Sequence, residues 1–168
     1  MKHLLLMRHA KSSQDLDGIT DFERPLNERG LKDAPEMGKR ILKSKFKPDL
    51  IVSSNARRAL DTAKLVAKQI KIDAAEIQRE TDLYEAGLSD ILHIIRHLDD
   101  SKSQIILIGH NPSFTGMVGY LSNSFIEHLP TSGIALIEFP VLSWKQITQG
   151  AGTMTWHDFP KNHLSRIQ

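Results

Sequence analysis

The stretch Leu4-Leu5-Leu6-Met7-Arg8-His9 indicates both the fold and the chemistry of this chain. Its apolar run, which starts after Lys2, predicts a buried β-strand close to the N-terminus. The strand delivers an arginine and a histidine at its end. A guanidinium is permanently charged, and an imidazole is a nucleophile when it is neutral. The pair therefore places a fixed cation beside a candidate nucleophile.

Short apolar runs alternate with amphipathic segments along the rest of the chain. Strands are expected at Lys2 to Met7, Asp49 to Val52, Gln104 to Ile108 and Ile134 to Phe139, with a weak extended piece from Ile77 and an antiparallel edge strand at Gly152 to Phe159. Helices are expected at Leu26 to Lys43, Ala56 to Ile70, Leu88 to Leu98, and after Asn111-Pro112, with Asn111 as N-cap and Pro112 as first helical residue. This alternation predicts an α/β fold with a mainly parallel sheet, whose ligands bind at the carboxyl ends of the strands.

The composition excludes several classes of protein. The chain has 168 residues, 40% of them hydrophobic and 25% charged, which suits a single domain over residues 1–168. A net charge of +2 without a long basic block gives little support for nucleic-acid binding. Cysteine is absent, which excludes disulfides, thiolate zinc sites and cysteine-nucleophile phosphatases. No run reaches the length of a membrane span or a signal-peptide core, so a cytoplasmic monomer is expected.

Two further predicted strands also end in groups that suit a phosphate. The second leads to Ser54, which as a helix N-cap places Arg58 in the first helical turn. The third leads to Gly109 and His110, and Gly109 is expected to let the backbone approach a ligand closely. A helix follows each strand, and its N-terminus adds N–H groups and partial positive charge.

Each of these signals also has an ordinary structural interpretation. An arginine-histidine pair is often a surface pair, Arg58 a solvated charge, and His110 a turn residue. Their joint position at one sheet edge nevertheless indicates a shared anion site. In that site a histidine, rather than a cysteine or a metal, does the chemistry.

Four segments together resemble the histidine phosphatase superfamily, and most closely its small SixA-type phosphohistidine phosphatases. They are Leu6-Met7-Arg8-His9-Ala10-Lys11-Ser12, Arg24-Pro25-Leu26-Asn27-Glu28-Arg29-Gly30, Ser54-x-x-x-Arg58-Ala59-x-x-Thr62-Ala63 and Gly109-His110-Asn111-Pro112, while Pro130-Thr131-Ser132-Gly133 resembles a further family loop. The resemblance runs from Lys2 to about Phe139 and leaves the later segment without a role. It implies one histidine phosphatase domain, a three-layer α/β/α sandwich with a phosphoglycerate mutase-like fold.

The resemblance also implies roles for four residues. His9 is expected to be the nucleophile and to carry a transient phosphoryl group. Arg8, Arg58 and His110 are expected to bind the phosphoryl oxygens. Because the guanidinium groups supply the positive charge, no metal and no other cofactor is expected.

Four other residues are weaker candidates. Asn27 is a lesser candidate for a contact in the pocket. Glu85 lies where the superfamily commonly carries its general acid, and a solvated loop carboxylate is an equal alternative. His93 and His97 have the spacing of metal ligands, but a solvated helix face is the better interpretation.

The expected function is a metal-independent phosphatase that removes phosphate from phosphohistidine on a protein, as in a signalling phosphorelay. The segment between Gly87 and Gln104 is short, which suggests an open pocket that a protein side chain enters. One alternative is a phosphatase of a small phosphorylated metabolite, which a working Glu85 acid would favour. A non-catalytic, phosphate-binding regulatory module is a third hypothesis.

Overall fold

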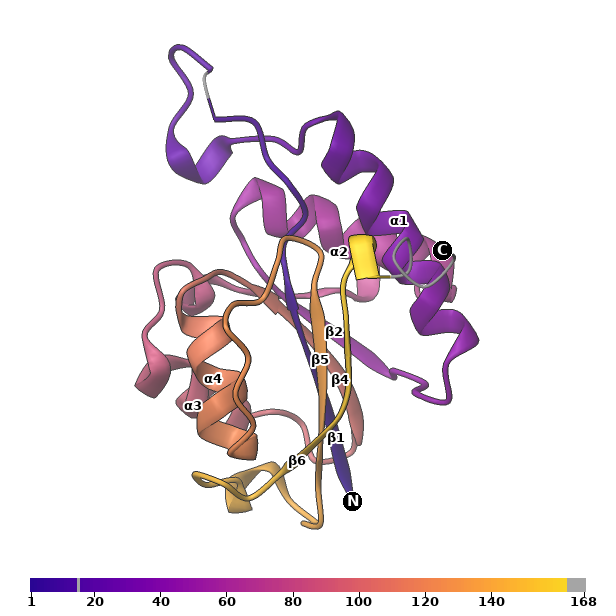
Figure 1. Ribbon diagram of the computed structural model, residues 1–168, viewed down its shortest axis with the longest axis vertical. Coiled ribbons are helices and arrows are strands. Elements are labelled where there is room, and N and C mark those ends of the chain that lie inside the picture. Colours follow the sequence, from indigo (N-terminus) through magenta and orange to yellow (C-terminus); the bar gives the residue numbers. More distant parts are fainter. Residues whose placement is uncertain (15, 163–168) are drawn as a thin grey trace.

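The computed structural model describes residues 1–14 and 16–162, and its helices cover both faces of a central sheet (Figure 1). The strands are β1 (Lys2–Arg8), β2 (Leu50–Ser54), β3 (Gln78–Glu80), β4 (Gln104–Gly109), β5 (Ile134–Phe139) and β6 (Thr153–Asp158). The α-helices are α1 (Glu28–Lys43), α2 (Arg57–Ile70), α3 (Leu88–Arg96) and α4 (Ser113–Ser122). Short 3₁₀ helices are η1 (Asp21–Glu23), η2 (Ala74–Glu76), η3 (Thr81–Leu83) and η4 (Trp144–Gln146). No helix in the described residues is long and apolar enough to cross a membrane.

The sheet is mixed, with the strand order β3-β2-β4-β1-β5-β6. Strands β3, β2, β4 and β1 pair in parallel, as the alternation of elements predicted. Strand β5 runs antiparallel to β1, and β6 runs antiparallel to β5 at the edge, where the sequence placed an antiparallel edge strand. The parallel neighbours β1 and β4 are in register with Arg8 opposite Gly109, so both strands end at the same level.

The side chains of β1 alternate between two apolar cores. Leu4 and Leu6 belong to the core under α3 and α4, whereas Leu5 and Met7 belong to the core under α1 and α2. All four are fully buried, which explains why a strand covered on both faces has a continuous apolar sequence. Burial of each such side chain contributes roughly 1.5–3 kcal/mol, so the strand that carries the site is firmly anchored.

Helix α1 begins two residues later than expected. Asn27 takes the N-cap position, and its side-chain oxygen accepts a hydrogen bond from the N–H of Gly30 at 2.9 Å. This bond satisfies one of the free N–H groups of the first turn, which accounts for the helix starting at Glu28 rather than Leu26.

The predicted caps of α2 and α4 are each displaced. Ala56 is the N-cap of α2, and Ser54 instead accepts a hydrogen bond from the N–H of Ala56 at 3.2 Å. Pro112 is the N-cap of α4, one residue after the predicted cap. Asn111 still accepts a hydrogen bond from the N–H of Thr115 at 3.2 Å, so its side chain does supply an acceptor to the first turn.

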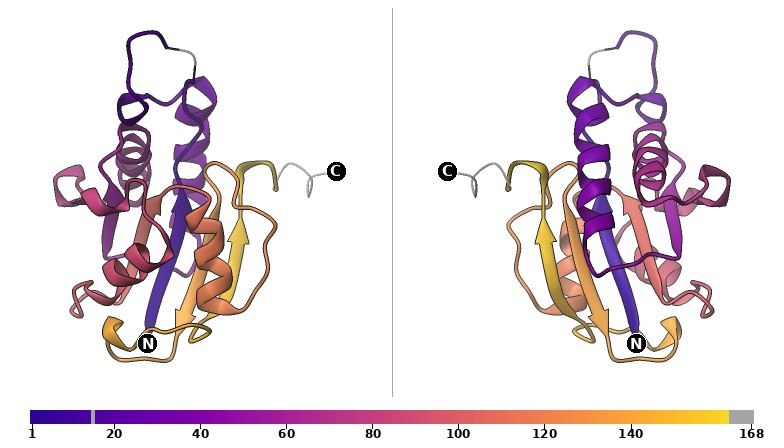
Figure 2. Two further views of the ribbon diagram at one scale, coloured as in Figure 1. Left: turned by 90° about the vertical axis from the view of Figure 1, so that its left-hand side faces the viewer. Right: turned by 90° about the vertical axis from the view of Figure 1, so that its right-hand side faces the viewer.

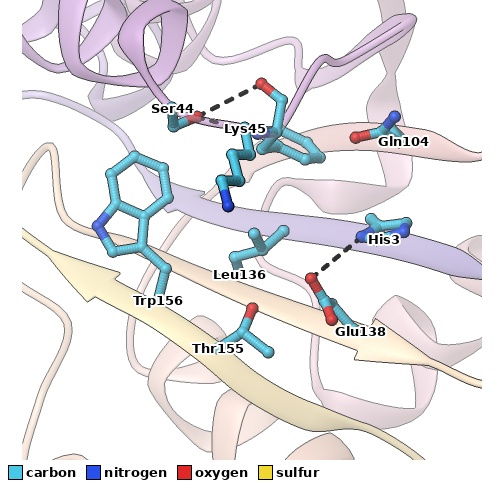
Figure 3. Close-up of a pocket in the computed structure, with 9 residues that line it drawn as sticks. His3, Ser44, Lys45, Gln104, Leu136, Glu138, Thr155 and Trp156 are labelled. Atoms are coloured by element: carbon cyan, nitrogen blue, oxygen red, sulfur yellow. Dashed lines mark hydrogen bonds and ion pairs between the residues drawn. The ribbon is translucent and has the colours of Figure 1, made fainter.

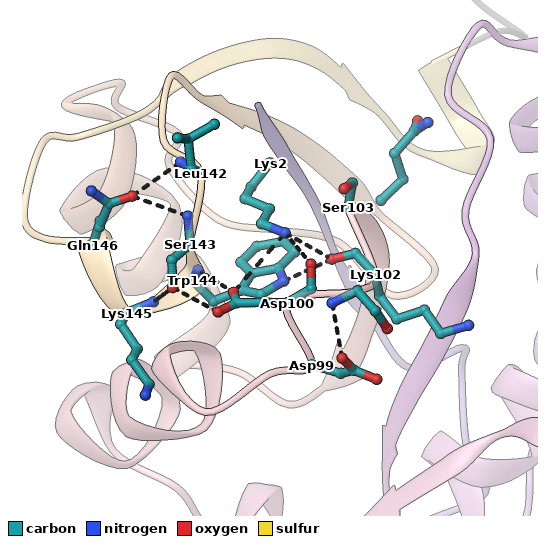
Figure 4. A network of polar contacts seen from close by, with 12 residues as sticks. Lys2, Asp99, Asp100, Lys102, Ser103, Leu142, Ser143, Trp144, Lys145 and Gln146 are labelled. Carbon is teal, nitrogen blue, oxygen red and sulfur yellow. Dashed lines mark hydrogen bonds and ion pairs between the residues drawn. The ribbon is translucent and has the colours of Figure 1, made fainter.

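A polar network closes the amino end of the sheet (Figure 4). The buried ammonium of Lys2 donates to the carbonyl oxygen of Asp100 at 2.8 Å and lies 5.4 Å from the ring centre of Trp144. The indole N–H of Trp144 donates to the carbonyl oxygen of Lys102 at 2.8 Å. The carboxylate of Asp100 accepts from the N–H of Trp144 at 2.9 Å. The network fastens η4 to the α3–β4 loop.

The segment between β1 and α1 rises beyond the carboxyl ends of the strands (Figure 2). An antiparallel bridge between Ser12 and Leu26 closes its base, and the N–H of Ser13 donates to the carbonyl oxygen of Pro25 at 2.9 Å. This closure brings η1 against α2, where Arg58 donates to the carbonyl oxygen of Asp21 at 2.7 Å.

Candidate active site

A polar cavity of about 180 Å³ lies at the carboxyl ends of β1 and β4. Its walls combine residues from the ends of strands and from the loops that follow them: Arg8, His9, Lys11, Ser12, Gln14, Arg24, Arg58, His110, Asn111 and Thr131. Arg8, His9, Arg58 and His110 therefore meet in one place. The imidazole rings of His9 and His110 leave adjacent parallel strands, and their centres are 5.2 Å apart.

The imidazole of His9 is held in one orientation. Its Nδ1 lies 2.7 Å from the carbonyl oxygen of Ala10. A carbonyl only accepts, so Nδ1 carries the hydrogen and Nε2 keeps a free lone pair. Burial is the main cause that lowers the pKa of His9 to about 3. The hydrogen bond to Ala10 opposes this effect, and the neighbouring His110, Arg58 and Arg8 add to it. His9 is therefore neutral and nucleophilic at Nε2 near pH 7.

Thr62 ties the end of β1 to α2. Its hydroxyl accepts a hydrogen bond from the N–H of Ala10 at 2.9 Å and donates to the carbonyl oxygen of Arg58 at 2.7 Å. Both bonds are buried, and they fix the backbone next to His9 relative to the helix that carries Arg58. This contact gives a physical reason for a threonine four residues after Arg58.

His110 is positioned by the serine at the end of β2. Its Nε2 lies 2.8 Å from the hydroxyl oxygen of Ser54, while its Nδ1 is buried without a hydrogen-bond partner in the described structure. When Ser54 donates to Nε2, Nδ1 carries the hydrogen and is available to an oxyanion. Burial first, and then the charge of Arg58, lower the pKa of His110 to about 4.

Three nitrogen atoms around the cavity are buried and have no hydrogen-bond partner among the described residues: Nε of Arg8, Nε of Arg58 and Nδ1 of His110. They come from three segments that are far apart in the sequence. Buried donors without partners cost free energy, so their convergence indicates a site prepared for a ligand that accepts hydrogen bonds. Two guanidinium groups suit an oxyanion such as a phosphoryl group.

The rim of the cavity contains residues that the sequence did not reveal. The carboxylate of Asp21 accepts hydrogen bonds from Tyr84 at 2.5 Å, Arg24 at 3.0 Å and Arg58 at 3.2 Å. Arg24 also donates to the hydroxyl of Ser12 at 2.6 Å. The hydrogen bond from Tyr84 is the largest cause that lowers the pKa of Asp21 to about 2. One hint of these residues was present in the sequence: Arg24 begins the segment 24–30, which resembles the superfamily.

Two predicted site residues lie outside the cavity wall. Asn27 is the helix cap described above and does not line the cavity. Glu85 has an exposed side chain and a left-handed backbone, with φ of 59°, and it is also absent from the wall. The close approach expected at Gly109 is to the core instead, because a Cβ there would lie 2.5 Å from the ring of Phe114.

The histidine pair on α3 is exposed. The ring centres of His93 and His97 are 4.1 Å apart, and Nδ1 of His97 is bonded to the carbonyl oxygen of His93 at 2.8 Å. Within residues 1–14 and 16–162, no group of three or more His, Cys, Asp or Glu side chains could hold a metal ion.

A larger cavity, of about 450 Å³, lies against the other end of β1 (Figure 3). Its wall includes Trp156, Lys45 and the pair formed by His3 and Glu138, in which Nδ1 of His3 lies 3.4 Å from a carboxylate oxygen of Glu138. None of the predicted site residues lines it. The volume of a cavity therefore does not identify the candidate active site of this protein.

These features describe an α/β protein with a polar cavity, in which two arginines lie beside a neutral, oriented histidine. The model of the histidine phosphatase superfamily (branch 1) matches residues 4–99, more than half of the sequence, and the chain belongs to this superfamily. Membership implies phosphatase activity on a phosphorylated substrate of some kind.

Solved structures of SixA-type proteins have the same fold. The protein histidine phosphatase SixA complexed with tungstate superposes with a TM-score of 0.82 at 20% identity, over 96% of this chain and 99% of that one. A putative SixA from Agrobacterium tumefaciens gives a TM-score of 0.74 at 28% identity, over 82% of this chain and 92% of that one.

Relatives found by sequence include an uncharacterised protein and a protein phosphatase. An uncharacterised protein of Mycobacterium tuberculosis is 28% identical, over 92% of this chain and 100% of its own length. The mitochondrial serine/threonine-protein phosphatase Pgam5 of Drosophila melanogaster is 24% identical, over 92% of this chain and 57% of its own length.

Proposed function

We propose that this chain is a phosphohistidine phosphatase that acts on phosphorylated proteins through a phosphoryl intermediate on His9, without a metal ion. The observation that carries the proposal is the set of three buried nitrogen atoms without hydrogen-bond partners, on Arg8, Arg58 and His110, around a neutral imidazole. The likeness to SixA-type proteins supports the same substrate class.

The first step is an in-line displacement at phosphorus. Nε2 of His9 gives its lone pair to the phosphorus atom, and the bond from phosphorus to the substrate nitrogen breaks. The electron pair of that bond stays on the leaving imidazole, which takes up a proton from solvent water. Arg8, Arg58 and His110 donate to the three equatorial oxygens, where negative charge develops.

The second step restores the enzyme. A water molecule attacks the phosphorus of phospho-His9, the bond from phosphorus to Nε2 breaks, and inorganic phosphate leaves. The hydrogen bond from Nδ1 of His9 to Ala10 persists through both steps and stabilises positive charge on the phosphorylated ring. The two-step route divides one difficult displacement into two.

We favour phosphohistidine over a phosphate ester as the substrate because of the leaving group that each would release. An alkoxide needs a proton from a general acid, whereas imidazole is a better leaving group. None of the described residues in the cavity wall is an aspartate or a glutamate. Asp21, on the rim, has a pKa of about 2 and is ionised at neutral pH, so it has no proton to give. Glu85 remains the candidate acid for a metabolite phosphatase.

A substrate panel tests this proposal. We expect kcat/KM to be at least tenfold higher for a phosphohistidine protein than for a phosphoserine peptide or p-nitrophenyl phosphate, with no change when EDTA is added. Faster turnover of the monoesters would assign the chain to metabolite or phosphoserine chemistry. Loss of activity with EDTA, restored by a divalent metal, would overturn the metal-free mechanism.

A further inference from the structure

A second set of cavities extends the catalytic cavity along α1. A cavity of about 360 Å³ shares Arg8 and Lys11 with the catalytic cavity. It is followed by one of about 510 Å³, which shares Arg29 and Lys161 with it. We call the two together the basic groove, because its walls carry Lys11, Arg29, Lys32, Lys39, Arg40 and Lys161.

The positive charge of the basic groove is largely uncompensated. Its two acidic residues are already paired, Asp33 with Arg29 at 3.4 Å and Glu36 with Arg40 at 3.3 Å. The four lysines of the groove form no ion pair with any described residue. The whole chain has a net charge of only +2, so basic charge is concentrated beside the catalytic cavity.

Hydrogen bonds hold the segments that form the walls of the groove next to α1. Arg40, from α1, donates to the carbonyl oxygens of Phe159 and Pro160 at 2.8 and 2.9 Å. These bonds hold the segment that carries Lys161 next to the helix. At the other end, the carbonyl oxygen of Lys11 accepts the N–H of Asn27 at 3.0 Å, just before α1 begins.

We propose that the basic groove docks an acidic segment of the phosphorylated protein, next to the residue that carries the phosphoryl group. This inference rests on the proposed function and adds the chemistry of the partner. Arg29 and Lys39 are ten residues apart on α1, a rise of about 15 Å. An extended peptide of roughly four or five residues spans that length, and a small metabolite does not. Acidic side chains match the lysines along it.

Two synthetic phosphohistidine peptides of equal length test the inference, one with glutamates and the other with glutamines beside the phosphohistidine. Kd, from fluorescence anisotropy, and kcat/KM are both measured. We expect the glutamate peptide to be favoured about tenfold at low salt. The preference is expected to fall below threefold at 0.5 M salt, because exposed charges are then screened.

The double variant Lys32→Gln/Lys161→Gln should reduce the preference to less than threefold and leave kcat on the glutamine peptide within twofold of the parent. The control Lys64→Gln/Lys68→Gln removes the same charge from exposed positions on α2 and should keep the full preference. Equal Kd values for both peptides, or a preference that survives the groove variant, would overturn the inference.

Failure of the proposed function gives a different result. If neither phosphohistidine peptide is hydrolysed, while the phosphoserine versions of the same peptides are, the substrate class is wrong. The groove is then judged by the Kd and kcat/KM ratios of the phosphoserine pair. If no peptide is hydrolysed, the ratio of Kd values alone supports or overturns the docking of an acidic segment.

Discussion

Asp21 holds the guanidinium of Arg58 through two different oxygens. Nη1 of Arg58 donates to the backbone oxygen of Asp21 at 2.7 Å, and Nη2 donates to the carboxylate at 3.2 Å. The backbone contact orients the guanidinium, while the carboxylate opposes its positive charge. A bound phosphoryl group therefore shares Arg58 with an internal anion.

Asp21→Asn should bind inorganic phosphate more tightly. The substitution removes a negative charge beside Arg58 but leaves the orienting backbone oxygen in place. We expect the inhibition constant of phosphate to fall about two- to fivefold, the size of effect that an ion pair with an exposed partner gives. Asp17→Asn, in the same segment, is the matched control and should change nothing. Weaker phosphate inhibition in Asp21→Asn would show that its carboxylate is needed chiefly to orient Arg58.

The buried histidines should make the protein less stable in acid. In the folded state the pKa of His9 is about 3 and that of His110 about 4, whereas both are near 6.5 when unfolded. Below pH 6.5 the unfolded chain binds more protons, so stability that is complete above this pH is lost as the pH falls toward the folded pKa values. Each histidine contributes roughly 1–2 kcal/mol to the loss between pH 7.5 and 5.

Urea unfolding at these two pH values measures this loss. We expect the pH dependence of the unfolding free energy to become shallower by that amount in His9→Asn and again in His110→Asn. An unchanged slope in both buried variants would mean that neither imidazole is held neutral by the fold.

Gly30 should be required for activity rather than for helix stability. A Cβ at this position would collide with the backbone oxygen of Lys11, two residues after His9. Gly30→Ala must therefore move the start of α1 or the end of β1, and we expect kcat/KM to fall tenfold or more. Gly119→Ala in α4 meets only an ordinary contact at 3.6 Å. This control should raise stability by about 0.5–1 kcal/mol with no effect on turnover.

The Lys2 network at the amino end of the sheet should affect stability without affecting catalysis. Asp100→Ala removes acceptors for the backbone N–H of Trp144 and the hydroxyl of Ser143. We expect the free energy of unfolding to fall, because both donors lose their acceptor. kcat/KM at a temperature where the variant is folded should stay within twofold of the parent. A large fall in kcat/KM would mean that the network controls the distant site.

The sequence predicts those elements of the fold that depend on a local pattern of apolar residues. The apolar run before Arg8 predicts β1 because side chains on both faces of the strand are buried. The strand at Gln104–Gly109 is predicted for the same reason. Since parallel strands end at one edge of a sheet, those two predictions were enough to bring His9 and His110 together.

The remainder depends on contacts between distant residues. The bond from Tyr84 to Asp21 joins positions 63 residues apart, and no local signal in the sequence marks either residue. The antiparallel direction of β5 was also beyond prediction, because its apolar run fits either orientation. Asn27 shows a third limit of prediction from sequence. We expected it to contact the pocket, but its side chain caps helix α1.

The central claim is that His9 carries the phosphoryl group during turnover. Rapid acid-free quenching of the enzyme with a phosphohistidine protein, followed by mass spectrometry of the digested chain, tests it most directly. We expect a phosphoryl group on the peptide that contains His9, stable in base and lost in acid, and absent from His9→Asn. Turnover by His9→Asn at the parent rate, or a phosphoryl group on any other residue, would contradict it.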